Sequence, residues 1–220
     1  MENNNEQDLR SLQLRFLGKI LAGFTHEIKN HLAIIKESAG LMGDMIKMGK
    51  SAESASGQYL EIVQSIEEQI AKALVHFTYL NRFSHRMDTP FSTFNVNESL
   101  EELTALLHRF ANQKRISLEK DLQKDLKPIN GNPSMLQFLV FHFLEETMAK
   151  LDKNSRIIVK TEGMNSSVAI RIIPEGNVLG TDAAKPECPH GIIDYLIKML
   201  SGTITKQEEE IIITLPIGGS

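Results

Sequence analysis

The sequence has a single cysteine and no long run of apolar residues. Cys188, alone among 220 residues, cannot form an internal disulfide and lacks the partner sulfurs of a structural zinc site. No segment approaches the roughly 18 to 20 apolar residues that cross a membrane, and residues 1–8 are polar and acidic, unlike a signal peptide. We therefore expect a soluble, cytoplasmic protein with no membrane partner.

An excess of basic charge is also absent. The chain has 24 Lys and Arg against 28 Asp and Glu, a formal net charge of -4, whereas nucleic-acid binding usually shows as a basic domain or stripe. We expect no nucleic-acid partner. What is present is an ordinary globular composition, 41% hydrophobic and 24% charged, in a chain long enough for one large domain or two small ones.

Residues 1–88 are predicted to form a long helical hairpin. No proline occurs between residues 8 and 47, and apolar positions recur there at alternating spacings of four and three, as on a helix packed in a bundle. The first stripe consists of Leu17, Leu21, Phe24, Ile28, His31, Ile35, Ser38, Met42 and Met45. After an expected loop over residues 49–57, a second stripe consists of Val63, Ile66, Ile70, Ala73, Phe77, Leu80, Ser84 and Met87.

A lone hairpin buries such stripes poorly. We therefore expect two copies to pair into a four-helix bundle, which makes the protein a homodimer. The alternative is that both helices pack on the C-terminal half of their own chain.

Residues 89–220 are predicted to form an α/β sandwich, which gives an α+β fold class for the whole chain. Pro90 makes continuation of the second helix unfavourable. Beyond it we expect helices from residue 97, over 135–151 and over 191–200, and strands at 91–96, 116–118, 156–161, 167–173, 203–205 and 210–215. This order favours helices on one face of a sheet.

The stretch HEIKNH, residues 26–31, raises the question of a metal site. Two histidines bind one zinc ion from a helix when they are four residues apart. His26 and His31 are five apart, which at about 100° per residue turns the rings about 140° from each other, so we expect no shared metal. His31 lies on the apolar stripe and is predicted to be a packed histidine with a hydrogen-bond partner, whereas His26 should point outward.

The helix around His26 is locally basic. Between residues 10 and 36 it carries five Lys and Arg side chains against Glu27 alone, which suits a phosphoryl group or an acidic partner surface. The residues predicted to dock such a partner are Arg15, Lys19, Gly23 and Lys29. A solvated charged face with an incidental histidine is the alternative.

Three residues of the stretch have a chemistry that suits phosphoryl transfer. The imidazole of His26 has a neutral, nucleophilic nitrogen at pH 7. The carboxylate of Glu27 could accept a proton or orient the ring. Asn30, one turn further on, could position a water molecule.

The chain resembles a two-component sensor histidine kinase over nearly all of its length. The stretch FTHEIKN matches the H-[ED]-x-x-N or T box of that family. The resemblance implies that His26 is the phosphoacceptor, that Glu27 is its acid/base neighbour, and that Asn30 is the residue with which family phosphatases orient water. His31 stands where many members have proline.

The resemblance also implies that residues 89–220 correspond to the family's ATP-binding domain, but the nucleotide motifs are lost. His142 and Glu146 stand where the family has asparagines that face the metal and the phosphates. The adenine-reading D-x-G-x-G is replaced by Pro174, Glu175 and Gly176, and residues 177–189 lack the second glycine-rich lid. We therefore predict no ATP binding, no cofactor and no resident metal, with Mg²⁺ supplied by a partner receiver domain.

These predictions define a histidine phosphotransfer protein, a pseudokinase without autokinase activity. In a phosphorelay, His26 would carry a phosphoryl group between the aspartates of response-regulator receiver domains. The alternatives are a response-regulator phosphatase that uses Asn30 and a non-catalytic pseudokinase scaffold.

Overall fold

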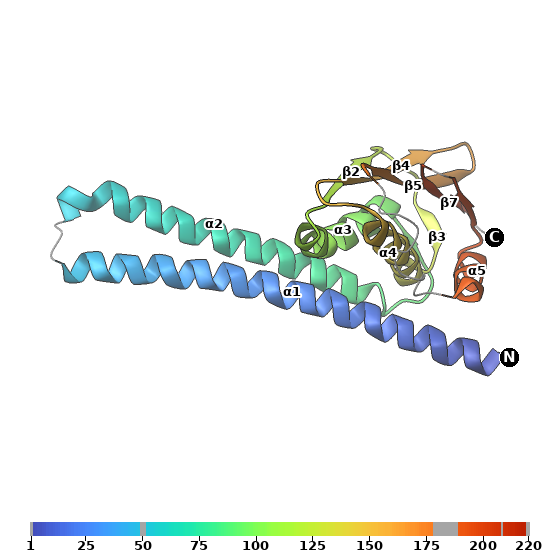
Figure 1. The fold of residues 1–220 in the computed structure, drawn as a ribbon, viewed down its shortest axis with the longest axis horizontal. Coiled ribbons are helices and arrows are strands. Elements are labelled where there is room, and N and C mark those ends of the chain that lie inside the picture. Colours follow the sequence, from blue (N-terminus) through green and yellow to red (C-terminus); the bar gives the residue numbers. More distant parts are fainter. Residues whose placement is uncertain (1, 49–51, 178–188, 208, 219–220) are drawn as a thin grey trace.

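The computed structural model describes residues 2–48, 52–177, 189–207 and 209–218. Cys188 and most of the predicted lid segment lie outside these residues. The described chain forms a helical hairpin followed by an α/β domain, which confirms the predicted α+β class (Figure 1). No helix among the described residues is long and apolar enough to cross a lipid bilayer.

The hairpin consists of α1 (Glu2–Lys47) and α2 (Ala52–His85). Residues 52–57, expected in the loop, belong to α2 instead, because alanine and serine in this stretch are compatible with a helical turn. The α/β domain lies beside the N-terminal half of α1 and the C-terminal half of α2, while the other end of the hairpin projects away from it (Figure 1).

In its described residues, the α/β domain has three helices and a five-stranded sheet. Its helices are α3 (Val96–Gln113), α4 (Pro133–Lys150) and α5 (His190–Met199). In spatial order the sheet consists of β2 (Ser117–Leu122), β4 (Arg156–Gly163), β5 (Ser167–Glu175), β7 (Ile211–Pro216) and β6 (Thr203–Lys206). Strands β2 and β4 run parallel and the other pairs antiparallel.

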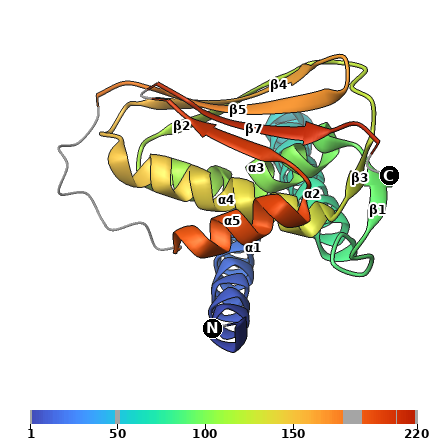
Figure 2. The same ribbon diagram turned by 90° about the vertical axis from the view of Figure 1, so that its right-hand side faces the viewer.

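The helices of this domain cover one face of the sheet, as the sequence predicted (Figure 2). Asn132 caps the start of α4 by accepting a hydrogen bond from the Met135 backbone N–H at 3.0 Å, with Pro133 in the first turn. A small antiparallel pair, β1 (Ser92–Phe94) with β3 (Ile129–Gly131), lies outside the main sheet. Strand β3 was not predicted, because two of its three residues, Asn130 and Gly131, are types that favour turns.

The N-terminal half of α1 packs on the α/β domain. Phe16 and Ile20 are 4% and 0% exposed and belong to the same core as the sheet and α4. The ring of Phe16 lies 4.6 Å from that of Phe141 in α4 and 5.5 Å from that of Phe83 in α2. Leu21 of the predicted stripe is 51% exposed in the single chain, because this part of the helix turns toward α4 as well as α2.

Helix α2 has two apolar faces where one was predicted. Ile62 and Gln69 are buried against α1, with the half-buried positions Ile66, Ala73 and His76 continuing this face. The predicted stripe positions Val63, Ile70 and Phe77 are 39%, 45% and 50% exposed. The predicted stripe therefore crosses between two neighbouring faces of α2, because a spacing of three and four residues fits both.

Candidate functional site

His26 and Asn30 are exposed in the middle of α1. They are four residues apart, so their side chains lie on the same side of the helix, about one turn from each other. Phe24, two residues before His26, is half-buried and packs edge-on against Phe77 of α2 with ring centroids 5.0 Å apart. The hairpin thus holds this turn of α1 in place while the imidazole of His26 faces outward.

Glu27 connects this turn to the α/β domain. Its side chain is 24% exposed, and its Oε1 lies 3.6 Å from Nη1 of Arg109, which is 17% exposed and belongs to α3. Because both partners are largely removed from water, this ion pair is screened less than one on an open surface. The neighbour of His26 is therefore held on the side that faces α3.

His31 lies between the two helices of the hairpin, as predicted. It is 9% exposed, and its Nδ1 lies 2.8 Å from Oε1 of the equally buried Gln69 in α2. Its ring also lies 5.5 Å from that of His76. The other ring nitrogen, Nε2, is buried without a hydrogen-bond partner.

His76 was missed by the sequence analysis. It is half-buried on α2, and one ligand atom of each of Glu27, His31 and His76 lies within 4.8 Å of the others. Burial lowers the pKa of His76, the Glu27 carboxylate raises it, and the neighbouring rings of His31 and His108 lower it further. Residue spacing within one helix cannot reveal this group, because His76 belongs to α2.

Two of the four predicted docking residues contact the chain's own α/β domain. A Cβ atom on Gly23 would lie 2.7 Å from Cε2 of Phe110, so the glycine permits close approach of α3 to α1. Lys19 is paired with Glu145 of α4, and its Nζ lies 5.9 Å from the ring centroid of Phe141. Arg15 and Lys29, the other two, are exposed.

His142 and Glu146, the two residues predicted to replace the nucleotide-site asparagines, lie next to each other on α4. His142 is 5% exposed on α4, and its Nε2 lies 4.0 Å from Oε2 of Glu146. Glu146 is also paired with Lys150 at 2.7 Å and with Lys206 of β6 at 3.4 Å. Burial would raise the pKa of Glu146, but the two lysines outweigh it, so the pKa is below its usual value and the group is a carboxylate. The Lys206 ammonium lies 5.0 Å from the ring centroid of Phe143.

A cavity of about 150 Å³ lies near these residues. It is lined by Thr147, Lys150, Leu151, Pro174, Gln207, Glu210 and Ile211. Pockets for small molecules usually measure roughly 300 to 1,000 Å³. This cavity is therefore smaller than most small-molecule pockets.

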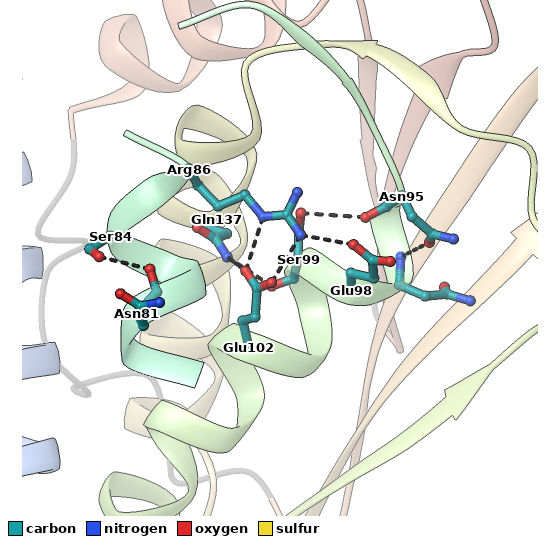
Figure 3. Close-up of polar contacts among 9 residues, drawn as sticks. Asn81, Ser84, Arg86, Asn95, Glu98, Ser99, Glu102 and Gln137 are labelled. Atoms are coloured by element: carbon teal, nitrogen blue, oxygen red, sulfur yellow. Dashed lines mark hydrogen bonds and ion pairs between the residues drawn. The ribbon is translucent and has the colours of Figure 1, made fainter. Parts of the chain in front are cut away.

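The end of α2 is fixed to α3 by a buried charge network (Figure 3). Arg86 donates to both oxygens of Glu102, at 2.9 and 3.1 Å, and to Glu98 at 3.0 Å. Gln137 of α4 donates to Glu102 at 3.0 Å and to the Ser99 carbonyl at 3.1 Å. Because Glu102 is 1% exposed, this network joins the hairpin to the domain through a desolvated carboxylate.

No family model matches the chain. In sequence the chain is similar to the signal transduction histidine-protein kinase AtoS of Escherichia coli, with 24% identity over 171 residues that cover 77% of this chain and 26% of that protein. It is also similar to sporulation kinase E of Bacillus subtilis, with 24% identity over 182 residues that cover 82% of this chain and 23% of that protein. The chain thus spans about a quarter of the length of these relatives.

Solved histidine kinases are similar in structure at low sequence identity. The Acinetobacter baumannii histidine kinase AdeS has a TM-score of 0.48 and 14% identity, covering 88% of this chain and 98% of that one. The histidine kinase ThkA, solved in complex with the response regulator protein TrrA, has a TM-score of 0.49 and 16% identity, covering 99% of this chain and 67% of that one.

Proposed function

We propose that the chain acts in two-component signalling as a histidine phosphotransfer protein. His26 accepts a phosphoryl group from the aspartyl phosphate of one response-regulator receiver domain and passes it to the aspartate of another. The observation that carries this proposal is the exposed imidazole of His26 in an H-E-x-x-N box on a helical hairpin. The likeness to histidine kinases supports it.

The transfer needs few groups from this protein. A lone pair of the His26 imidazole attacks phosphorus, a P–N bond forms, and the P–O bond to the aspartate breaks to release its carboxylate. The proton of the second ring nitrogen leaves to solvent or to the carboxylate of Glu27, which lies next to His26 in the chain and 3.6 Å from Nη1 of Arg109. The reverse sequence delivers the group to the second receiver, and Mg²⁺ bound by the receiver neutralises the phosphoryl oxygens.

We infer that the chain does not phosphorylate itself from ATP. Glu146 places a negative charge, already paired with two lysines, where the family presents amides to the metal and phosphates. The small cavity beside it supports the same conclusion. The α/β domain then serves as a scaffold that holds α1 through Gly23, Glu27 and Lys19.

We further propose that two hairpins pair as a homodimer. The hairpin exposes apolar residues beside the α1–α2 contact, and Phe77, at the edge of that contact, is still 50% exposed. On α2 they recur at spacings of three, seven, four and three, and the set is Leu60, Val63, Ile70, Leu74 and Phe77, with Leu21, Leu32 and Ile46 exposed on one side of α1. A monomer that left this face in water would be unfavourable, whereas a four-helix bundle buries it.

Phosphotransfer is tested with receiver domains labelled by radioactive acetyl phosphate. The proposal predicts acid-labile label on the wild-type chain and none on His26→Gln. His85→Gln is the matched control, because His85 is an exposed histidine of α2 that pairs with Asp88 at 2.8 Å. Label on His26→Gln would contradict the assignment of the acceptor, and micromolar ATP binding would contradict the loss of the nucleotide site.

A phosphatase is the second candidate, favoured by the exposure of Asn30 one turn from His26. In the same assay it would release free phosphate from the receiver, and Asn30→Ala would slow this release while His26→Gln would not abolish it. If neither label nor free phosphate appears, the scaffold function is supported.

A further inference from the structure

Two helices bring three metal-binding groups together. Glu27 and His31 are four residues apart on α1, so they share one face of the helix, and His76 faces them from α2. One ligand atom of each lies within 4.8 Å of the others, and this is the only group of at least three such residues in the part of the chain that the structure describes. The HEIKNH stretch thus contributes to a candidate site, but through Glu27 and His31 and not through its two histidines.

His31 is prepared for a ligand that the protein does not supply. Its Nδ1 lies 2.8 Å from the amide oxygen of Gln69, which holds the proton on Nδ1 and leaves a lone pair on Nε2. That Nε2 is buried and has no hydrogen-bond partner, although the residue is 9% exposed. An unpaired polar atom in this position is unfavourable, and a hydrogen bond from the other ring nitrogen is how metal-binding histidines are oriented.

We propose that Glu27, His31 and His76 bind a divalent transition metal, with Zn²⁺ as the best match, between α1 and α2. Two imidazoles and one carboxylate are a ligand set that zinc uses when its fourth position is left to water. Tetrahedral ligands of zinc lie about 3.4 Å apart at bond lengths of roughly 2.0 to 2.2 Å. The three side chains therefore need to close by small rotations, which the half-buried Glu27 and His76 can make.

The guanidinium group of Arg109 in α3 lies beside the proposed site and is compatible with metal binding by Glu27. Arg109 lies 3.6 Å from Oε1 of Glu27, beyond normal hydrogen-bond distance, so the carboxylate retains capacity for a second cation. A bound metal would compete with Arg109 for Glu27. Metal binding should therefore weaken one of the contacts that hold the α/β domain on the hairpin.

The proposal is tested by metal titration of the full chain after treatment with a chelator. Zn²⁺ is titrated in competition with a chromophoric indicator at neutral pH, and Co²⁺ is used to record the absorption bands of a tetrahedral site. We expect one metal per chain, and a loss of affinity of about tenfold or more in each of Glu27→Gln and His76→Gln. These two positions are half-buried, so both variants should fold, which circular dichroism verifies.

Two controls separate this site from other histidines. His85→Gln and His26→Gln should bind Zn²⁺ like the wild type, since neither residue belongs to the group. Absence of a stoichiometric site, or an affinity that either Glu27→Gln or His76→Gln leaves unchanged, would overturn the three-ligand site. Because phosphotransfer is read separately from label on His26, failure of one proposal leaves the other intact.

Discussion

Removal of the Arg86 side chain should lower the free energy of unfolding far more than removal of an exposed arginine. Glu102 is 1% exposed, and apart from Arg86 only Gln137 donates to its carboxylate among the hydrogen bonds of Figure 3. In Arg86→Ala the charge of Glu102 stays buried with no cation. Breaking such a pair costs about 3 to 5 kcal/mol of the free energy of unfolding, a large part of the roughly 5 to 15 kcal/mol that a domain has.

The assay is urea denaturation followed by circular dichroism. Arg82→Ala is the matched control, because Arg82 is an exposed arginine one turn earlier on α2, and its loss should change the stability by about 0.5 kcal/mol or less. The double variant Arg86→Leu with Glu102→Leu should recover most of the loss, since replacing both partners of a buried pair is often neutral.

A loss below about 1 kcal/mol in Arg86→Ala, or a loss equal to that in Arg82→Ala, would refute the reasoning. Either result would mean that water reaches Glu102 or that the carboxyl takes up a proton. The network would then not be what joins α2 to α3.

Three further predictions concern the interface, the core and the dimer. Gly23→Ala should gain less than the about 1 kcal/mol that alanine brings to a helix, because the new methyl group meets Phe110; the full gain in urea denaturation would contradict this contact. Burial lowers the pKa of His142, opposed by Glu146, so protonation favours the unfolded chain and stability should fall as pH drops below about 6.5. His142→Asn should reduce this fall, and an identical pH profile would count against it. Leu74→Lys should convert the proposed homodimer to a monomer in light scattering, and an unchanged dimer mass would exclude that face.

Much of the fold could be predicted from local patterns. The helices of the hairpin, the break at Pro90 and the strands β4 and β5 all follow from signals within a few residues. The packing of His31 against a polar partner followed from its position on the apolar stripe.

What could not be predicted depends on which surfaces meet. The periodicity of α1 shows an apolar face but not that Phe16 and Ile20 turn toward α4. Likewise, the group around His31 includes His76, which is 45 positions away in the sequence and enters only when α2 folds back along α1. One sequence does not predict such a contact, because the contact depends on how the two helices are rotated relative to each other.

The most direct test of the account is transfer of label to the chain from the complete set of the organism's receiver domains, each phosphorylated with radioactive acetyl phosphate. We expect at least one receiver to lose its label to the wild-type chain, with the label acid-labile and absent from His26→Gln. If every receiver keeps its label, or if His26→Gln is labelled like the wild type, His26 is not a phosphoryl carrier.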